Sequence, residues 1–238
     1  MIKDSIIERQ MGVLRSILGD FANRNPVADE DFIMLVNKYF YFDTKFGWNL
    51  FMNAFYIFED TELAKTDFKK FDLQGPSRHE DNEGEKYLRL YGVLNALYQQ
   101  YLALINLMEL FKIASKKQYT SQLKKTEAIA LRNKIASHSA NYLEGDNEEG
   151  MSVYEISRHD LNVGKIILLK NQDVFETYDL DVAIKHFDKQ AEDILNEILT
   201  KFIKKKFNNQ GKYFEELKKI GLLRNGAIEM GDQIITFV

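Results

Sequence analysis

The chain has 238 residues, a length that suits one large domain or two small ones. It is 45% hydrophobic, so it can bury a substantial core, and its 2 prolines favour long uninterrupted helices. The absence of cysteine excludes disulfides, cysteine-based zinc sites and thiol catalysis. The net charge of −4 gives no global sign of nucleic-acid binding, so any basic site must be local.

The N-terminal segments predict helices with many aromatic residues. Residues 2–19 carry apolar side chains at steps of three and four, which is the spacing of an amphipathic helix. The aromatic stretch 32–58 is interpreted as two helices around Gly47, followed by a short helix over 62–71. Core packing explains the aromatic side chains, and a base-stacking platform is the alternative.

A polar segment with glycine and proline, residues 74–85, predicts a linker. Residues 87–111 then predict the longest helix, because two apolar rows repeat along it at helical spacing. The next helix is predicted over 121–138, and either Ser121 or Thr126 is a candidate N-cap.

The rest of the chain predicts a small β insertion and two further helices. Residues 152–156 and 165–170 are rich in β-branched and aromatic side chains, which predicts a hairpin between helices. Helical spacing returns over 181–207 and 213–220, with Gly221 as a helix stop. The tail that follows is expected to be extended.

These elements predict a mainly α protein, a helical bundle with a small inserted β-hairpin. We expect an N-terminal helical layer over 1–75, a main bundle over 86–206 with the hairpin at about 150–172, and a C-terminal helix and tail over 207–238. No apolar run has the length of a signal peptide or a membrane span. We therefore expect a cytoplasmic protein without a membrane partner.

Arg132 and His138 carry the two groups that metal-free RNA cleavage needs. An always-charged guanidinium holds a phosphate, and a near-neutral imidazole moves a proton at physiological pH. On an ideal helix these groups would lie about 120° apart and about 9 Å along the axis. Either the helix distorts near His138, or two copies of the pair meet across a two-fold dimer interface. The plainer alternatives are a surface ion pair for Arg132 and a helix-end contact for His138.

The chain that leads to this pair is strongly basic. Between Lys112 and Lys134 the only acidic residue is Glu127. A local positive field raises the concentration of a polyanion, and a solvated helix face is the alternative. The candidate RNA-binding residues are Lys116, Lys117, Lys124, Lys125 and Lys134.

A second basic cluster lies near the end of the predicted helix 181–207 and consists of Lys201, Lys204, Lys205 and Lys206. It is interpreted as a charged helix end, with RNA contact as the alternative. No pair of histidines has metal-ligand spacing, and no phosphate-binding glycine loop is present. The sequence therefore predicts neither a metal nor a cofactor.

The stretch from Leu131 to His138 resembles the signature of the HEPN superfamily, an arginine followed by a polar residue and, after a short spacer, a histidine. The helix around residues 90–98 resembles the long bundle helix of that family, and the resemblance covers residues 86–206. It implies an HEPN-like bundle, a homodimer and, in many members, metal-independent endoribonuclease activity. Such members are often toxins or abortive-infection factors for phage defence, whereas others are inactive scaffolds or nucleotide binders.

The resemblance also implies roles for three residues. Arg132 would bind the scissile phosphate, and Asn133 would orient a side chain or bond a phosphate oxygen. His138 would act as general base on the 2′-hydroxyl or as general acid on the leaving 5′-oxygen. The expected partners are RNA, a second copy of the chain and an antitoxin protein. The alternative function is a non-catalytic helical module that binds RNA, a nucleotide or a protein.

Overall fold

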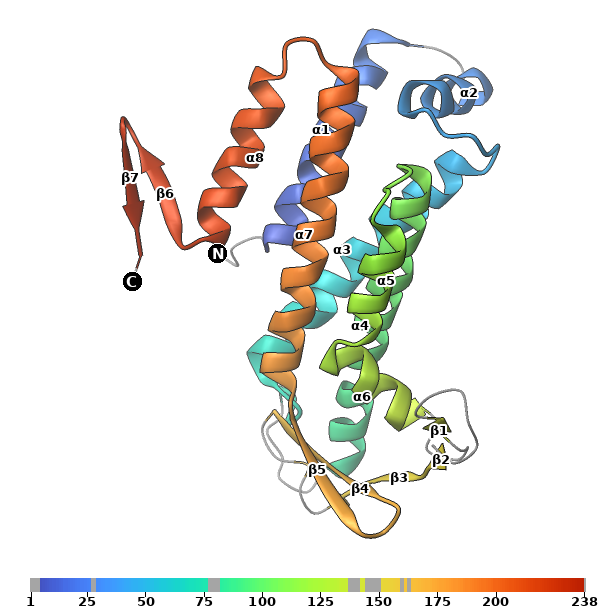
Figure 1. Ribbon diagram of the computed structural model, residues 1–238, viewed down its shortest axis with the longest axis vertical. Coiled ribbons are helices and arrows are strands. Elements are labelled where there is room, and N and C mark those ends of the chain that lie inside the picture. Colours follow the sequence, from blue (N-terminus) through green and yellow to red (C-terminus); the bar gives the residue numbers. More distant parts are fainter. Residues whose placement is uncertain are drawn as a thin grey trace. The chain divides into compact units, whose positions relative to one another are not determined.

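The structure is a computed structural model that describes residues 5–26, 29–76, 82–136, 142–143, 151–158, 161 and 164–237. Helices dominate these residues, and short antiparallel strands complete them (Figure 1). The predicted mainly α class is therefore confirmed. None of the helices in this part of the chain carries an apolar stretch long enough to cross a lipid bilayer.

The chain forms two compact units, each assembled from separate segments. Unit 1 consists of Met1–Glu59, Ala103–Lys117 and Ala191–Val238, and unit 2 consists of Asp60–Leu102 and Gln118–Gln190. The predicted domains 1–75, 86–206 and 207–238 are contiguous ranges, and they stay a prediction.

Unit 1 combines helices with a C-terminal hairpin. Its elements are α1 (Ile6–Arg24), α2 (Asp29–Phe40), the first part of α3 (Gly47–Phe71), the later parts of α4 (Glu83–Leu110) and α7 (Leu180–Lys206), α8 (Gly211–Arg224), β6 (Ala227–Met230) and β7 (Gln233–Thr236). Helix α1 begins at a capping box, in which the Ser5 hydroxyl accepts from the Glu8 amide and the Glu8 carboxylate accepts from the Ser5 amide. Helix α8 packs beside α1 (Figure 1).

The core of unit 1 is aromatic. The ring of Phe40 stacks on that of Phe202 with centroids 4.9 Å apart, and the rings of Phe51 and Phe111 lie 4.9 and 6.2 Å from Phe40. All four side chains are buried. Core packing, the predicted role of the aromatic stretch, is confirmed for Phe40 and Phe51. Tyr41, next to Phe40, keeps 41% of its surface exposed.

Unit 2 combines the other helices with a small sheet. It holds the rest of α3, α4 and α7, most of α5 (Lys116–Lys124), α6 (Glu127–Ala136), and the strands β1 (Tyr142–Leu143), β2 (Met151–Ser152), β3 (Tyr154–Ile156), β4 (Lys165–Lys170) and β5 (Val174–Asp179). Strands β3, β4 and β5 form an antiparallel sheet in that order, and β1 pairs with β2. Helix α6 packs against β3.

The predicted hairpin is confirmed as the pair β3–β4, but the third strand, β5, is absent from the prediction. The chain enters β5 through Asn171 and Gln172, whose φ angles of 50° and 57° are left-handed. Glycine is the usual signal for such a turn, and here neither residue is glycine. The sequence therefore lacks the mark that would reveal the turn and the strand after it.

Three predicted long helices are confirmed, with different ends. The ranges 2–19, 87–111 and 181–207 correspond to α1, α4 and α7. The separate helix predicted over 62–71 is wrong, because α3 continues to Phe71 and no glycine or proline interrupts it after Gly47. In the predicted linker 74–85, residues 77–81 lie outside the described residues.

The single helix predicted over 121–138 is wrong, because the chain forms α5 and α6 with a turn between them. The Thr126 hydroxyl donates to the Leu123 carbonyl at 2.7 Å, so it serves the end of α5 instead of accepting from the start of α6. Ser121 lies inside α5. Neither candidate cap therefore fulfils its predicted role.

Near the C-terminus, Gly221 does not stop the helix, because α8 continues to Arg224. The chain turns instead at Gly226, whose φ of 69° suits glycine. The extended tail is confirmed as the antiparallel pair β6–β7.

A charged cluster is buried in unit 2. The Lys65 side chain is 1% exposed, and its ammonium pairs with Glu62 and with Asp188 at 2.6 Å. The Glu62 carboxylate, 3% exposed, also accepts from the Gln100 amide at 2.6 Å. These bonds tie α3, α4 and α7 together within unit 2, and Lys65 is the cation that the two carboxylates share.

We expect Lys65→Met to lower the free energy of unfolding by about 3–5 kcal/mol, because it leaves the Glu62 carboxylate buried without a cation. Urea denaturation followed by circular dichroism measures the effect. The matched control is Lys69→Met, one turn further along α3 and 3.5 Å from the same Asp188. Its side chain is 46% exposed, so we expect a loss of about 0–1 kcal/mol. Equal losses for the two variants would contradict the assigned role of Lys65.

Candidate functional site

Helix α6 carries the predicted catalytic arginine. The helix buries its apolar side chains, among them Leu131 and Ile135. Arg132 and Asn133 are half-buried, so they lie at the edge of this packing and keep access to solvent. His138 and Ser137 lie outside the described residues.

Arg132 is held by an aromatic ring of α4. Its guanidinium carbon lies 3.9 Å from the centre of the Tyr98 ring, and its Nη1 donates to the Asn133 Oδ1 at 3.2 Å. Tyr98 is itself packed against Tyr101, with ring centroids 5.6 Å apart. A cation above an aromatic face is attracted to it, so the contact favours one orientation of the arginine.

Lys134, predicted as an RNA-binding residue, is 8% exposed. Its ammonium donates to the Glu176 carboxylate at 2.7 Å and to the Tyr178 hydroxyl at 2.8 Å, and it lies 4.5 Å from the centre of the Tyr154 ring. The charge of Lys134 is therefore used inside unit 2, between α6 and the sheet. The predicted contact of Lys134 with RNA would compete with these bonds, and it forms no part of the proposed function.

The protonation of this cluster is set by burial and by hydrogen bonds. Burial alone would lower the pKa of Lys134, but the bonds to Glu176 and Tyr178 outweigh it and raise that pKa above its ordinary value. Burial would raise the pKa of Glu176, and the bond from Lys134 lowers it overall. Burial, with the bond to Glu176, raises the pKa of Tyr178 to about 12. At neutral pH the cluster is thus an ion pair with a protonated tyrosine.

The other predicted RNA-binding lysines fall in different units. Lys116 and Lys117 belong to unit 1, and Lys116 pairs there with Glu109. Lys124 and Lys125 belong to unit 2, and both are exposed. Lys116, Lys117 and Lys124 lie on α5, with Lys125 directly after it, and the role of these four lysines in RNA binding stays a prediction.

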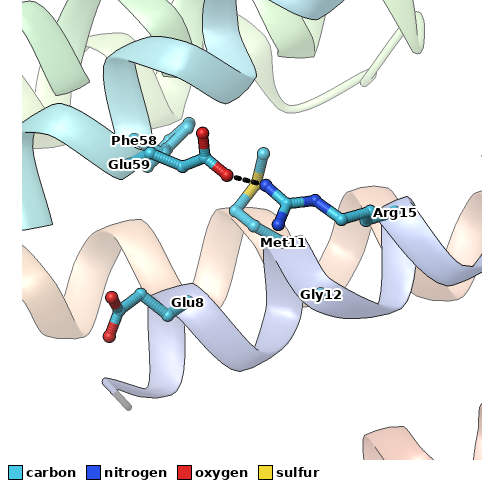
Figure 2. A pocket seen from close by; sticks show the side chains of 6 residues that line it. All are labelled: Glu8, Met11, Gly12, Arg15, Phe58 and Glu59. Carbon is cyan, nitrogen blue, oxygen red and sulfur yellow. Dashed lines mark ion pairs between the residues drawn. The ribbon is translucent and has the colours of Figure 1, made fainter. Parts of the chain in front are cut away.

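A cavity of about 310 Å³ opens between α1 and α3 in unit 1 (Figure 2). Its charged groups already have partners, because Arg15 pairs with Glu59 and Glu8 closes the capping box of α1. This cavity offers no unpaired reactive group. The described residues also contain no group of three or more side chains suited to holding a metal ion.

The sequence prediction missed two features of the site, the contact of Tyr98 with Arg132 and the buried position of Lys134. Tyr98 belongs to an apolar row of α4, and no local pattern marks it as the partner of an arginine on α6. Lys134, in contrast, follows Leu131 by three residues, so helical spacing places it near the buried face of α6. That spacing is the signal that its charge points inward.

Comparison with protein-family models, with curated proteins and with solved structures finds no match to this chain. The resemblance to the HEPN superfamily therefore rests on the residues of the motif. A function for the chain has to be argued from the chemistry of its site.

We expect the free energy of unfolding to fall as the pH rises from 10 to about 12, in part through Tyr178. The unfolded tyrosine loses its proton near pH 10, whereas the folded one keeps it up to about 12, so deprotonation favours unfolding in this window. Lys134 acts in the same direction, because its folded pKa is also raised. Urea denaturation at several pH values should give a shallower decline for Tyr178→Phe than for the wild type. Parallel curves would contradict the assignment.

Proposed function

We propose that the chain is a metal-independent endoribonuclease of the HEPN type, which cleaves single-stranded RNA with Arg132 and His138. The setting of Arg132 carries the proposal. The carbon of its guanidinium lies 3.9 Å from the centre of the Tyr98 ring, and the side chain is half-buried. One donor, Nη1, is bonded to Asn133, and the remaining N–H groups are the donors that would meet phosphate oxygens, which Arg binds in a forked geometry.

In the proposed reaction, the RNA 2′-oxygen attacks the adjacent phosphorus and the bond to the 5′-oxygen breaks. His138 accepts the proton of the 2′-hydroxyl or donates a proton to the leaving 5′-oxygen. Arg132 stabilises the negative charge that develops on the phosphoryl oxygens, with Asn133 bonded beside it. The products are a 2′,3′-cyclic phosphate and a 5′-hydroxyl, and the chain needs no metal or cofactor for these steps.

A homodimer belongs to this proposal. A regular helix would separate Arg132 and His138 by about 120°, and a two-fold interface could gather two pairs in one cleft. The HEPN resemblance also suggests a toxin or phage-defence role, with an antitoxin as a further partner. We expect expression of the wild type to slow cell growth more than expression of His138→Ala.

We expect purified protein to cleave single-stranded RNA in the presence of EDTA. Arg132→Ala should lower the cleavage rate about 10²–10³-fold, the usual cost of removing one charge-stabilising donor, and His138→Ala should abolish cleavage. Gel analysis of labelled RNA and mapping of the product ends measure these effects. The same sequence as DNA should stay intact, because it lacks the attacking hydroxyl.

The matched histidine control is His186→Ala, since His186 is exposed on α7. It should cleave at the wild-type rate. If wild type, His138→Ala and His186→Ala are equally inert on varied RNAs in EDTA, the nuclease proposal fails and a non-catalytic binding module is favoured.

Tyr98 is proposed as a positioning residue for Arg132. We expect Tyr98→Leu to lower the cleavage rate about 5–30-fold, because a partly desolvated cation–π contact contributes about 1–2 kcal/mol, and Tyr98→Phe should keep most of the rate. In an Arg132→Ala background, Tyr98→Leu should have no further effect. Single-turnover rates of the four variants test this, and an equal loss in both backgrounds would contradict positioning.

A further inference from the structure

Unit 1 carries a basic and aromatic surface that plays no part in the proposed chemistry. We call it the strip and define it by Tyr39, Tyr41, Lys112, Lys201, Lys205 and Lys206. The strip connects two hollows of the unit. One, of about 110 Å³, is lined by Tyr41, Lys112, Lys201 and Lys205, and the other, of about 350 Å³, is lined by Tyr39, Arg24 and Lys212 among others.

Lysines and tyrosine rings alternate along the strip. The Lys206 ammonium lies 3.8 Å from the centre of the Tyr39 ring and 5.0 Å from that of Tyr41. The Lys205 ammonium lies 4.2 Å from the centre of the Tyr41 ring. Lys206 therefore lies near one tyrosine ring of each hollow, and the exposed ring of Tyr41 has two cations beside it.

The charge of the strip is positive although the chain is net acidic. Within the described residues, two lysines of this region form ion pairs: Lys112 pairs with Asp43, and Lys212 pairs with Asp20. The ammonium groups of Lys205 and Lys206 lie near tyrosine rings instead. The positive charge that remains raises the local concentration of a polyanion.

Two residues of the strip also have an unusual backbone conformation. Tyr41 and Lys112 each follow a helix with left-handed φ angles of 60° and 52°. In both cases the next amide reaches back five residues, from Phe42 to the Asn37 carbonyl and from Ile113 to the Met108 carbonyl, each at 2.9 Å. This helix ending ordinarily takes glycine at the left-handed position, because a side chain is strained there. A tyrosine and a lysine held at such positions in one hollow point to a use for their side chains.

We propose that the strip binds single-stranded RNA, with phosphates along the lysines and a base stacked on Tyr41. Alternating cations and aromatic rings are what a single strand requires, since its backbone is charged and its bases are open for stacking. The choice of RNA rests on the proposed function, whereas the phosphate and stacking chemistry would hold a single strand of DNA as well. An acidic protein would need the charges but not the exposed ring.

The test uses the full chain with His138→Ala, which keeps the RNA intact, and a fluorescein-labelled uridine-rich RNA of about 20 nucleotides. Fluorescence anisotropy at several salt concentrations gives the affinity and its salt slope. Adding Lys205→Ala and Lys206→Ala should make the slope shallower by about 1.4, because each lost phosphate contact on a single strand removes about 0.7.

The left-handed positions allow a sharper variant. Tyr41→Gly and Lys112→Gly should each weaken binding about fivefold or more, while the melting temperature is unchanged or higher because glycine fits the backbone. A variant that only damaged the fold would lower both the RNA affinity and the melting temperature. The matched control is Gln172→Gly, at a left-handed turn position of unit 2 with φ 57°, which should leave binding unchanged.

The inference is overturned if the strip variants bind RNA as tightly as the parent, or if duplex and single strand bind equally and Tyr41→Gly has no effect. The first result would leave an acidic protein as the occupant of the strip. Failure here is distinct from failure of the nuclease proposal. If the wild type cleaves RNA and the strip variants bind RNA normally, only the strip proposal is contradicted. If the wild type is inert but its RNA binding depends on the strip, only the nuclease proposal is contradicted.

Discussion

The buried ammonium of Lys134 is the contact on which the arrangement of the candidate site depends. It joins α6 to β5 through Glu176 and Tyr178, while Arg132, two residues earlier, rests on Tyr98 of α4. The helix is therefore held from two sides at neighbouring positions, which fixes its rotation about its own axis. In the proposed function, binding of a phosphate by Arg132 would cost little entropy, because the donor is already oriented.

Burying a charged side chain to fix the orientation of a helix costs free energy unless every partner of the charge is present. Lys134 faces a carboxylate, a hydroxyl and an aromatic ring, and Lys65 faces two carboxylates, so each cation is compensated within unit 2. Such pairs add little net stability compared with apolar packing, but breaking one leaves an expensive uncompensated charge. Their effect is to favour one alignment of α3 with α7, and one of α6 with β5, over alternatives that would separate the charges.

The sequence predicts the elements of this fold where periodicity is strong. The apolar rows of α4 and α7 identify both helices, and the β-branched runs identify β3 and β4. It misses β5 because Asn171 and Gln172 make a left-handed turn without glycine, and it joins α5 to α6 because Thr126 lies in a turn that contains no breaker. Of the candidate site, the motif predicts Arg132 and Asn133, and their roles stay predictions. The partner Tyr98 is set by packing between helices, which one sequence does not record, and the role of His138 stays a prediction.

The two proposals concern residues of different units. Arg132, proposed to hold the reacting phosphate, belongs to unit 2, and the strip belongs to unit 1. A short motif with one arginine gives little affinity, since each phosphate contact releases few counterions. Contacts away from the reacting phosphate can supply that affinity and help to position the strand for cleavage.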